Sequence, residues 1–185
     1  ELGIVRDGEF TIETDVGVLG ARFQGNSPEI DLNPVAGLRE STGLPLEAGE
    51  QRMGFALAGV PHLTILVDDV ERVDVVGRGR PLRHHKSLQA GANVNFVRPM
   101  GPGLWAYRTY ERGVEAETLA CGTGAVATAA LLTAWGLVDG PVRIRTRSGK
   151  ELGVRFTDRD GAKVPSLTGE ARIVFAGRLG EVSPR

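Results

Sequence analysis

The chain has 185 residues, of which 41% are hydrophobic and 24% are charged, and its 22 basic and 23 acidic residues leave a formal net charge of -1. This composition is typical of a globular protein and excludes a disordered chain. The near-neutral charge argues against a broad surface for nucleic acid or an anionic membrane and favours a small neutral or zwitterionic partner.

The first third of the chain is expected to form strands and a linker. Polar and apolar residues alternate from Glu9 to Phe23 and from Glu29 to Leu32, which predicts antiparallel strands. Residues 33–49 are rich in Pro, Gly and Glu and favour a linker between two halves of the molecule. Residues 55–66 predict one strand that bends near Pro61, because a proline cannot donate to the ladder of a sheet.

The rest of the chain adds a short helical element and further strands. The stretch from Val70 to Val76 predicts a short helix or turn. Residues 93–97 and 104–110 are expected to be strands, and a last strand is expected over residues 167–175. Because these strands bracket one central helix, the expected fold class is α+β.

An uncharged run from Thr118 to Val138 supplies that central helix. It consists mostly of Ala, Val, Leu and Thr, and it predicts a helix from Gly122 to about Trp135 that Gly136 ends. A membrane span would need about 18 apolar residues. Three glycines and four threonines make this run too weakly hydrophobic, so we expect a buried helix of a globular domain and no membrane.

Cys121, the only cysteine, directly precedes this helix. The unpaired N–H groups and positive dipole end of a helix favour a thiolate, and the N–H groups of Gly122 and Thr123 could hold a substrate carboxylate. A lone cysteine is usually a small buried hydrophobe. Gly122 and Gly124 favour a reactive site instead, because they open the backbone to a ligand and weaken the helix without a visible packing reason.

The cysteine and histidine content narrows the chemistry further. One cysteine cannot form an internal disulfide, and an exposed working thiol suits a reduced, cytoplasmic compartment. Three histidines and one cysteine show no spacing typical of a metal site, so no metal is expected. His62 follows Pro61 and is interpreted as a structural histidine that bonds the backbone rather than as a catalytic base.

Two segments of the chain match each other. Residues 2–23 align with residues 135–156 when Arg6 and Lys150 are treated as one-residue insertions. The matched pairs include Gly8 with Gly140, Ile12 with Ile144, Thr14 with Thr146, Gly17 with Gly149, Leu19 with Leu152, Arg22 with Arg155 and Phe23 with Phe156. The second copy follows the Cys121 helix with a turn and a hairpin, and the first copy should do likewise. Glu1 to Val5 would then be the last turn of a helix whose own catalytic-type residue lies about a dozen residues upstream.

Several motifs, in this order, closely resemble the diaminopimelate epimerase family. They are Pro61-His62, Ala92 to Phe96, Tyr110 to Gly113, Glu117 to Ala125 and Leu167 to Ala171. The resemblance runs over nearly all of the chain. It implies a mixed or antiparallel sheet wrapped around a central apolar helix, in two pseudo-symmetric domains of which the first is truncated. Residues 1–36 would be the last strands of that first domain, residues 37–166 the C-terminal epimerase domain, and residues 167–185 a strand that returns toward the first domain.

The resemblance implies a reaction as well. Members of this family interconvert LL- and meso-diaminopimelate, for lysine and peptidoglycan precursor biosynthesis, and they use two cysteines without pyridoxal phosphate, a metal or another cofactor. Two thiols are needed because a base removes the α-proton from one face while an acid delivers a proton to the other. Cys121 would be the second cysteine, and the first would lie in a missing N-terminal domain.

The substrate contacts are implied by the same resemblance. Arg112 would clamp the distal carboxylate with its forked guanidinium, and Asn93 would contribute to the same end. Glu111 would lie close to the substrate amino group. The N–H groups of Gly122 and Thr123 would meet the charge that builds on the α-carboxylate.

One departure from the family pattern is visible, and two other readings stay open. The Gly-Asn-Pro-His motif of the family reads Gly59-Val60-Pro61-His62 here, and Val60 cannot make the hydrogen bond of that asparagine, although His62 is kept as a supporting residue. A sister racemase for histidine or hydroxyproline is one alternative, although Arg112 favours a substrate with a second carboxylate. A non-catalytic binding module is the other. The truncated chain alone is expected to be inactive.

The missing helix has a further consequence for the first copy of the repeat. Apolar residues that this helix should cover, such as Ile12 and Phe23, are expected to be partly exposed. The chain should therefore associate, and a homodimer is one possible form of that association.

Overall fold

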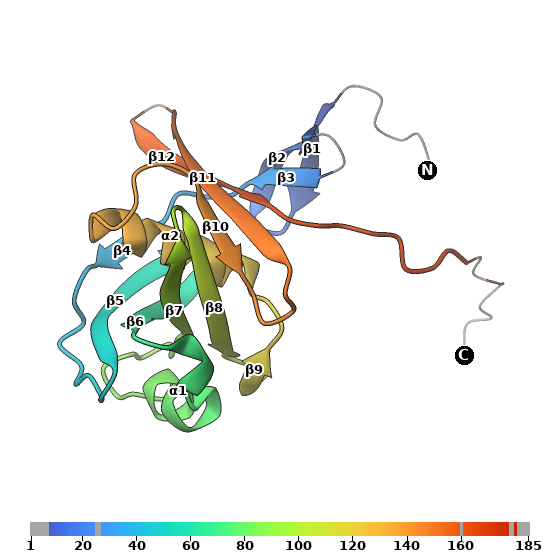
Figure 1. Ribbon diagram of the computed structural model, residues 1–185. Helices are drawn as coiled ribbons and strands as arrows, with labels where there is room; N and C mark the ends of the chain where they lie inside the picture. Colours follow the sequence, from blue (N-terminus) through green and yellow to red (C-terminus); the bar gives the residue numbers. More distant parts are fainter. Residues whose placement is uncertain (1–7, 25–26, 160, 178–179, 181–185) are drawn as a thin grey trace.

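The computed structural model describes residues 8–24, 27–159, 161–177 and 180. Its strands form one sheet in the order β1-β2-β3-β12-β11-β10-β8-β7-β6-β5-β4, and β9 pairs with β8 at the side (Figure 1). The strands are β1 (Glu9–Thr14), β2 (Gly17–Gln24), β3 (Ser27–Asp31), β4 (Ala36–Arg39), β5 (Glu50–Ala58), β6 (Val60–Val67), β7 (Asn93–Gly101), β8 (Leu104–Glu111), β9 (Ala116–Thr118), β10 (Val142–Arg145), β11 (Glu151–Arg159) and β12 (Ala162–Thr168). The helical elements are the 3-10 helix η1 (Val70–Arg72) and the helices α1 (Val75–Arg83) and α2 (Gly122–Ala134).

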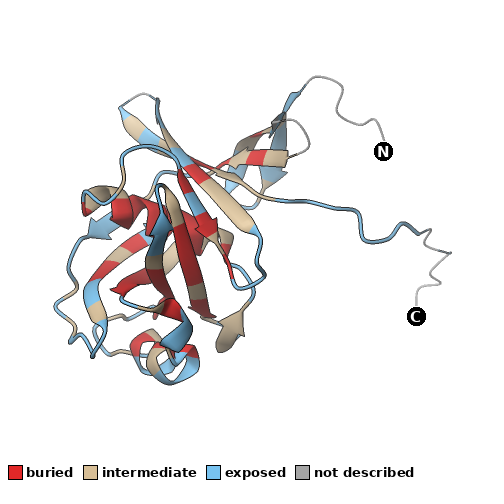
Figure 2. Ribbon diagram, viewed as in Figure 1, coloured by how far each residue is buried: buried red, intermediate tan, exposed pale blue. Residues whose placement is uncertain are grey.

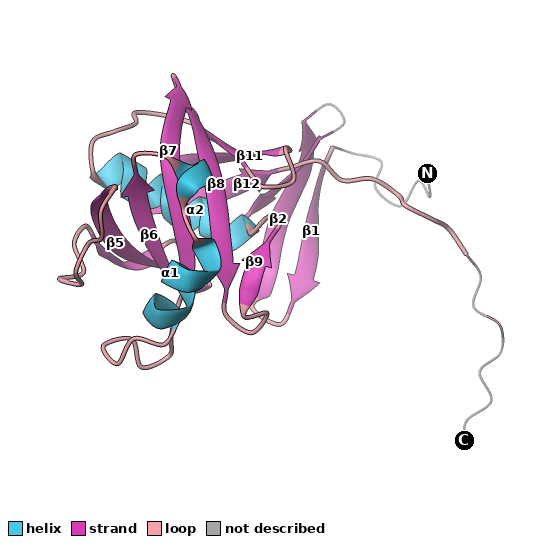
Figure 3. Ribbon diagram, turned by 60° about the horizontal axis from the view of Figure 1, so that its bottom comes forward, coloured by secondary structure: helices cyan, strands magenta, loops and turns pink. Residues whose placement is uncertain are grey.

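Helix α2 lies inside the curl of this sheet. It contacts β5 and β6 on one side and β11 and β12 on another (Figure 3). Residues 124–132 are all buried, because a helix that is apolar on every face needs cover on every face. The expected α+β fold, with a mixed sheet around a central apolar helix, is therefore confirmed.

Gly136 ends α2. Gly136 has a φ of 69°, which glycine adopts without strain, and its N–H bonds the Thr133 carbonyl at 3.0 Å. The N–H of Leu137 bonds the Leu132 carbonyl, also at 3.0 Å. These two bonds satisfy the last carbonyls of the helix and turn the chain toward β10.

A second core lies on the opposite face of the sheet. Helix α1 packs there against β7 and β8, over buried residues that include Leu63, Ile65 and Phe96. Figure 2 shows that the buried segments gather on α2 and on β6, β7 and β8, while β1 and β2 are mostly exposed or half-buried. The middle of the chain is thus a sheet with one helix on each face. This packing holds the ends of its strands in place, and side chains at those ends could form a site.

The two copies of the repeat fold into hairpins with the same register. Equivalent residues face equivalent partners across β1 and β2 and across β10 and β11. These pairs are Ile12↔Leu19 with Ile144↔Leu152, and Thr11↔Gly20 with Arg143↔Gly153. Lys150, which the alignment treats as an insertion, lies in the second turn, where its carbonyl accepts the Thr146 N–H at 3.0 Å. The repeat is confirmed over the described residues, whereas the helical turn expected over residues 1–5 lies outside them.

The two hairpins are joined through β3 and β12, which lie between β2 and β11 and pair with each other, with Ile30 opposite Leu167. The equivalent residues Arg22 and Arg155 converge there on one carboxylate. Arg22 Nη2 and Arg155 Nε each lie 2.7 Å from Glu29 Oε1, and Glu29 is only 1% exposed. Burial by itself raises the pKa of Glu29, but hydrogen bonds from Arg155 and Arg22 outweigh it and lower the pKa to about 2. This ion pair cluster joins the two hairpins.

The β1–β2 hairpin leaves apolar side chains uncovered. Ile12 is 38% exposed and Phe23 is 51% exposed, as the sequence predicted. Their equivalents in the second copy are covered, since Ile144 is fully buried and Phe156 packs against the core around α2. The difference comes from α2, which covers the second copy and has no equivalent over the first among the residues that the structure describes.

Three sequence predictions about strands are wrong. Residues 55–66 form parts of two antiparallel strands, β5 and β6, rather than one bent strand, because Gly59 with a φ of 69° makes a tight turn before Pro61. The expected linker over residues 33–49 contains β4, which pairs with the edge of β5. The last strand ends at Thr168 rather than Phe175, because its pairing with β3 ends there.

The short helical element is longer than predicted. The stretch from Val70 to Val76 holds η1 and the start of α1, which runs on to Arg83. Asp74 caps α1 by accepting the Gly77 N–H at 2.9 Å. Across the described residues, no helix is both long enough and apolar enough to cross a membrane.

We predict that Glu29 makes the stability of the chain depend on acid. Its pKa is about 2 in the folded state and 4.5 as the ordinary value, so its stabilising effect is present above pH 4.5 and is lost as the pH falls toward 2. Glu29→Gln should lower the free energy of unfolding at pH 7 by roughly 2–3 kcal/mol, and the deficit should shrink at pH 3. Urea unfolding at the two pH values measures it.

Glu13→Gln, at an exposed position of β1, is the matched control and should change little at either pH. A Glu29→Gln deficit of the same size at pH 7 and pH 3 would contradict the assignment.

Candidate active site

The residues that the sequence singled out gather at one edge of the sheet. Strands β6 and β7 run parallel and β8 runs antiparallel to β7, so the beginnings of β6 and β7 meet the end of β8. His62 and Asn93 face each other in the register of β6 and β7, and Glu111 is the last residue of β8. Cys121 arrives at this edge as the residue before α2.

Cys121 begins α2 without capping it through its side chain. Its backbone is extended, with φ -134° and ψ 111°, and its carbonyl accepts the first helical hydrogen bond, from Ala125. The residue is 8% exposed, and its Sγ lies 3.6 Å from Thr123 Oγ1. The predicted helix start is therefore confirmed, and the N–H groups of Gly122 and Thr123 lie in the first turn, which has no helical acceptors.

The thiol is less acidic than the sequence suggested. Burial raises the pKa of Cys121, and hydrogen bonds from Thr123 and from the Gly124 N–H oppose the change only in part. The negative charge of Glu111 also raises the pKa. Desolvation of the sulfur thus works against the effect that the sequence suggested for the helix start.

Asn93 and Arg112 hold each other in place. The Arg112 N–H donates to Asn93 Oδ1 at 2.7 Å, and Asn93 is 4% exposed. The Arg112 guanidinium is anchored at one nitrogen, because Nη1 donates to the Ala90 carbonyl at 2.7 Å. Within the described part of the chain the guanidinium makes no other hydrogen bond, so its remaining donors are available to a ligand.

The turn that carries Arg112 is fixed by Glu115. This residue has a φ of 59°, which is uncommon for a side chain other than glycine, and its N–H bonds the Glu111 carbonyl at 2.8 Å. Its carboxylate accepts from the Gly113 N–H at 2.9 Å and from Arg83 Nε at 3.0 Å. The bond from Gly113 and the bonds from Tyr110 and Arg83 lower the pKa of Glu115 to about 2. The turn is thereby preorganised.

Glu111 is tied to the strand that leads to the cysteine. Thr118 Oγ1 donates to Glu111 Oε1, and Glu111 faces Ala116 in the register of β8 and β9. Leu119 follows β9, and its carbonyl accepts the Ser148 N–H from the tip of the β10–β11 hairpin at 3.1 Å. The segment before Cys121 is therefore held from two sides.

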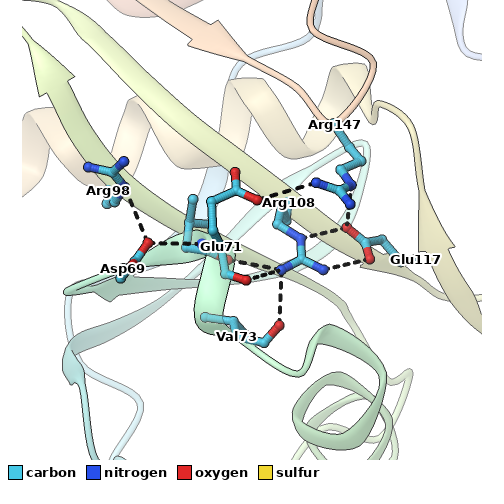
Figure 4. A network of polar contacts seen from close by, with 8 residues as sticks. Asp69, Glu71, Val73, Arg98, Arg108, Glu117 and Arg147 are labelled. Carbon is cyan, nitrogen blue, oxygen red and sulfur yellow. Dashed lines mark hydrogen bonds and ion pairs between the residues drawn. The ribbon is translucent and has the colours of Figure 1, made fainter.

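A network of ion pairs also fixes β9, the strand that precedes Cys121 (Figure 4). Arg108 binds Glu117 through two parallel bonds of 2.7 and 2.8 Å. Its Nη1 also donates to the carbonyls of Val70 and Val73, each at 3.0 Å. Arg147 bridges Glu117 and η1 by its bond of 3.3 Å to Glu71. Since Glu117 belongs to β9, the network stabilises the approach to Cys121.

The sequence predicted that His62 bonds the backbone, but its ring nitrogens lie next to side chains instead. It is fully buried, and its two ring nitrogens lie 3.2 Å from Thr123 Oγ1 and 3.3 Å from Asn95 Nδ2. Burial lowers the pKa of His62 to about 3, and the nearby positive charge of Arg112 adds to the effect. The ring is therefore neutral at physiological pH.

The sequence did not identify the buried polar side chains behind the cysteine. Tyr107 and Thr109 on β8 both donate to Asn95 Oδ1, at 2.8 and 2.9 Å. A signal was present, because strand residues two apart share a face. Asn93 and Asn95 on β7, and Tyr107, Thr109 and Glu111 on β8, follow that period in otherwise apolar strands. Only the pairing of the two strands shows that the two sets meet.

The model of the family described as diaminopimelate epimerase matches residues 55–174. The diaminopimelate epimerase of Gemmatimonas aurantiaca is 47% identical over 96% of this chain and 67% of its own length. That of Aquifex aeolicus is 44% identical over 98% of this chain and 65% of its own length. The chain thus spans about two thirds of the length of these curated relatives.

Solved structures share the fold at low sequence identity. A hydroxyproline epimerase from Agrobacterium vitis gives a TM-score of 0.68 at 21% identity and covers 91% of this chain and 58% of that one. A phenazine biosynthesis protein of the PhzF family from Bacillus anthracis gives 0.67 at 12% identity, over 89% and 66%. The fold is that of a class of proteins that includes this hydroxyproline epimerase and a probable proline racemase. Within this class, the chain belongs to the diaminopimelate epimerase family.

The structure gives Gly124 a packing reason that the sequence did not show, and we predict that a larger residue does not fit there. A Cβ at this position would lie 2.2 Å from the Tyr107 hydroxyl and 2.9 Å from Asn95 Oδ1, both of which are buried. Gly124→Ala should lower the free energy of unfolding by about 1–3 kcal/mol, despite the better helix propensity of alanine. Gly101→Ala is the control, since nothing lies within 4 Å of its Cβ. Urea unfolding should separate the two variants, and equal stabilities would argue against this close contact.

A second prediction concerns the reactivity of the thiol. Because the pKa of Cys121 is raised from 9.0, alkylation by iodoacetamide should be slow at pH 7 and its rate should have a midpoint above pH 9.0. Mass spectrometry can follow the reaction at a single site, as the chain has one cysteine. In urea the midpoint should fall back to the ordinary value. A midpoint near or below pH 7 in the folded chain would show instead that the helix start dominates.

Proposed function

We propose that this chain forms one side of the active site of an isomerase that interconverts LL- and meso-diaminopimelate. The observation that carries the proposal is the meeting of Cys121, Glu111 and Arg112 at the edge where α2 begins, in a chain 47% identical to a curated diaminopimelate epimerase. A proton-exchanging sulfur, an acidic group and a cation lie together there. An amino acid with a second carboxylate needs these three kinds of group.

Cys121 exchanges the proton of the α-carbon. In one direction its S–H bond breaks as a C–H bond forms on the substrate carbanion, and in the other direction its thiolate removes the same proton. A second cysteine, from the part of the protein that this chain does not span, acts on the opposite face. The raised pKa of Cys121 favours its thiol form, the form in which Cys121 acts as the acid and its counterpart as the base.

The first turn of α2 receives the α-carboxylate. The N–H groups of Gly122 and Thr123 point out of the helix start, where they stabilise the charge that grows on this carboxylate as the proton leaves. Glu111 attracts the substrate ammonium group. His62 supports the site through Thr123, to which its ring is bonded.

Arg112 receives the distal carboxylate. Its anchored Nη1 fixes the plane of the guanidinium, and the remaining donors match the two oxygens of a carboxylate. Asn93 acts here by holding the backbone of Arg112, since its Oδ1 already accepts that N–H. A substrate with a second carboxylate therefore fits this site better than histidine or hydroxyproline does.

The uncovered apolar face receives the rest of the protein. Ile12 and Phe23 are the equivalents of side chains that α2 and its core cover in the second copy. Ile173, Val174 and Phe175 extend from β12 and are 76%, 84% and 85% exposed. A domain that repeats the architecture of the second copy, with its own cysteine at the start of its own helix, would cover the face of the first hairpin.

The test uses a chimera in which this chain is joined to the third of the Gemmatimonas aurantiaca relative that it does not match. In deuterated water, mass spectrometry should detect deuterium at the α-carbons of meso-diaminopimelate with the chimera, and much less with the chain alone. Cys121→Ala should slow exchange by the chimera about 10²–10⁴-fold, because the acid on one face is lost. Met100→Ala, at a residue 42% exposed near the other end of β7, is the control and should exchange at the unaltered rate.

Other outcomes have definite meanings. Binding of meso-diaminopimelate without exchange by a folded chimera would indicate a binding module and overturn the proposal. Exchange with histidine or hydroxyproline, but not with meso-diaminopimelate, would indicate a sister racemase. Exchange that survives Cys121→Ala would show that the proton travels through another group.

A further inference from the structure

A chain of hydrogen bonds runs from the interior of the sheet to the cysteine sulfur. Asn95 Nδ2 lies 3.3 Å from His62 Nδ1, and His62 Nε2 lies 3.2 Å from Thr123 Oγ1. Thr123 Oγ1 in turn lies 3.6 Å from Cys121 Sγ. His62 and Asn95 are fully buried, Cys121 is nearly so and Thr123 is half-buried, so the bond between Asn95 and His62 is shielded from water. The direction of each hydrogen bond therefore depends on which end of this series of bonds has its donors and acceptors fixed.

That end is Asn95. Its Oδ1 accepts from the hydroxyls of Tyr107 and Thr109 at 2.8 and 2.9 Å, which uses both lone pairs of the oxygen. Its Nδ2 then faces His62 Nδ1 and, at 3.5 Å, Thr64 Oγ1. Turning the amide over would place N–H groups against both hydroxyls and deprive the buried Thr109 hydroxyl of this acceptor. The amide group therefore presents a donor to His62.

This donor fixes the position of the proton on His62. The ring is neutral because burial lowers the pKa of His62 to about 3, so it carries one proton. With Nδ1 accepting from Asn95, that proton lies on Nε2 and points to Thr123 Oγ1. Thr123 Oγ1 accepts this bond, and its own hydroxyl proton is left to point toward the sulfur of Cys121.

The geometry points to Asn95 as a positioning residue that, through His62, makes the Thr123 hydroxyl a hydrogen-bond donor to Cys121 Sγ. The inference deepens the proposed function and rests on it for its purpose, which is to stabilise the sulfur when it has given up its proton. A hydrogen bond to the charged form favours that form. The titratable and charged groups that face this sulfur and this ring are Glu111 and Tyr107 from β8, His62 from β6, and Arg112 after β8.

The test begins with the tautomer of His62, without substrate. Two-bond ¹H–¹⁵N spectra of the folded chain should show the His62 ring neutral at pH 5, with its proton on Nε2. Asn95→Asp keeps the shape but offers His62 an acceptor, so the proton should move to Nδ1. A proton on Nδ1 in the unsubstituted chain would overturn the proposal.

The second measurement is the pH profile of Cys121 alkylation. Thr123→Val should slow the reaction roughly tenfold at a given pH below the midpoint, which corresponds to a pKa higher by about one unit, because the donor is removed. Thr123→Ser keeps the hydroxyl and should restore the rate. Asn95→Asp should slow the reaction by at least as much as Thr123→Val.

Two controls separate hydrogen bonding from charge and from misfolding. Asn33→Asp adds the same charge at an exposed position and should leave the profile unchanged. In a Thr123→Val background, Asn95→Asp should have a smaller effect than it has alone, because the two changes interrupt one chain. The proposal fails if Asn95→Asp moves the proton on His62 but changes the alkylation profile equally in the Thr123→Val background and in the unsubstituted chain. The hydrogen bonds would then not reach the sulfur.

These measurements need no substrate, so their outcome is independent of the exchange experiment. A chimera that does not exchange the α-proton would refute the proposed reaction while the tautomer and the alkylation profile still stood. An active chimera with an unaltered profile in Thr123→Val would refute the positioning role alone.

Discussion

The enclosure of α2 is the constraint on which the rest of the structure depends. The helix is uncharged and is buried along residues 124–132, so its apolar surface can be removed from water only if the sheet curls around it. The curl brings β5 and β6 to one side and β11 and β12 to the other. It also brings the first turn of the helix, whose N–H groups have no helical acceptors, to the end of the sheet where β8 ends, and the candidate site lies there.

Burial sets the chemistry of that edge as much as the choice of residues does. It raises the pKa of Cys121 and lowers the pKa of His62, so both groups are neutral at rest. Charge is kept on Glu111 and Arg112, which are both half-buried. Neutral groups in the interior can be connected by hydrogen bonds without an uncompensated ion, and the buried polar side chains from Asn95 to Thr123 use this freedom.

The repeat explains why the molecule has both a closed and an open half. The two hairpins share one register and are joined through Glu29, on which the equivalent arginines Arg22 and Arg155 converge. Two equivalent surfaces must have equivalent needs for cover, because the same alternation places the same kinds of side chain on them. One surface has α2 and the other has Ile12 and Phe23 in solvent. A symmetric pair of halves also suits a reaction that works on two opposite faces of one carbon.

The sequence by itself determined the features whose causes are local. The bounds of α2, the strands before Glu111, the repeat and the family could all be predicted, because helix ends, alternation and motifs are contained in short stretches of residues. Only the tertiary structure decided which strands pair. It placed a hairpin turn at Gly59, ended β12 at Thr168 and brought Asn95 behind His62. Pairing depends on residues far apart in the chain, and so does the burial that raises the pKa of the Cys121 thiol.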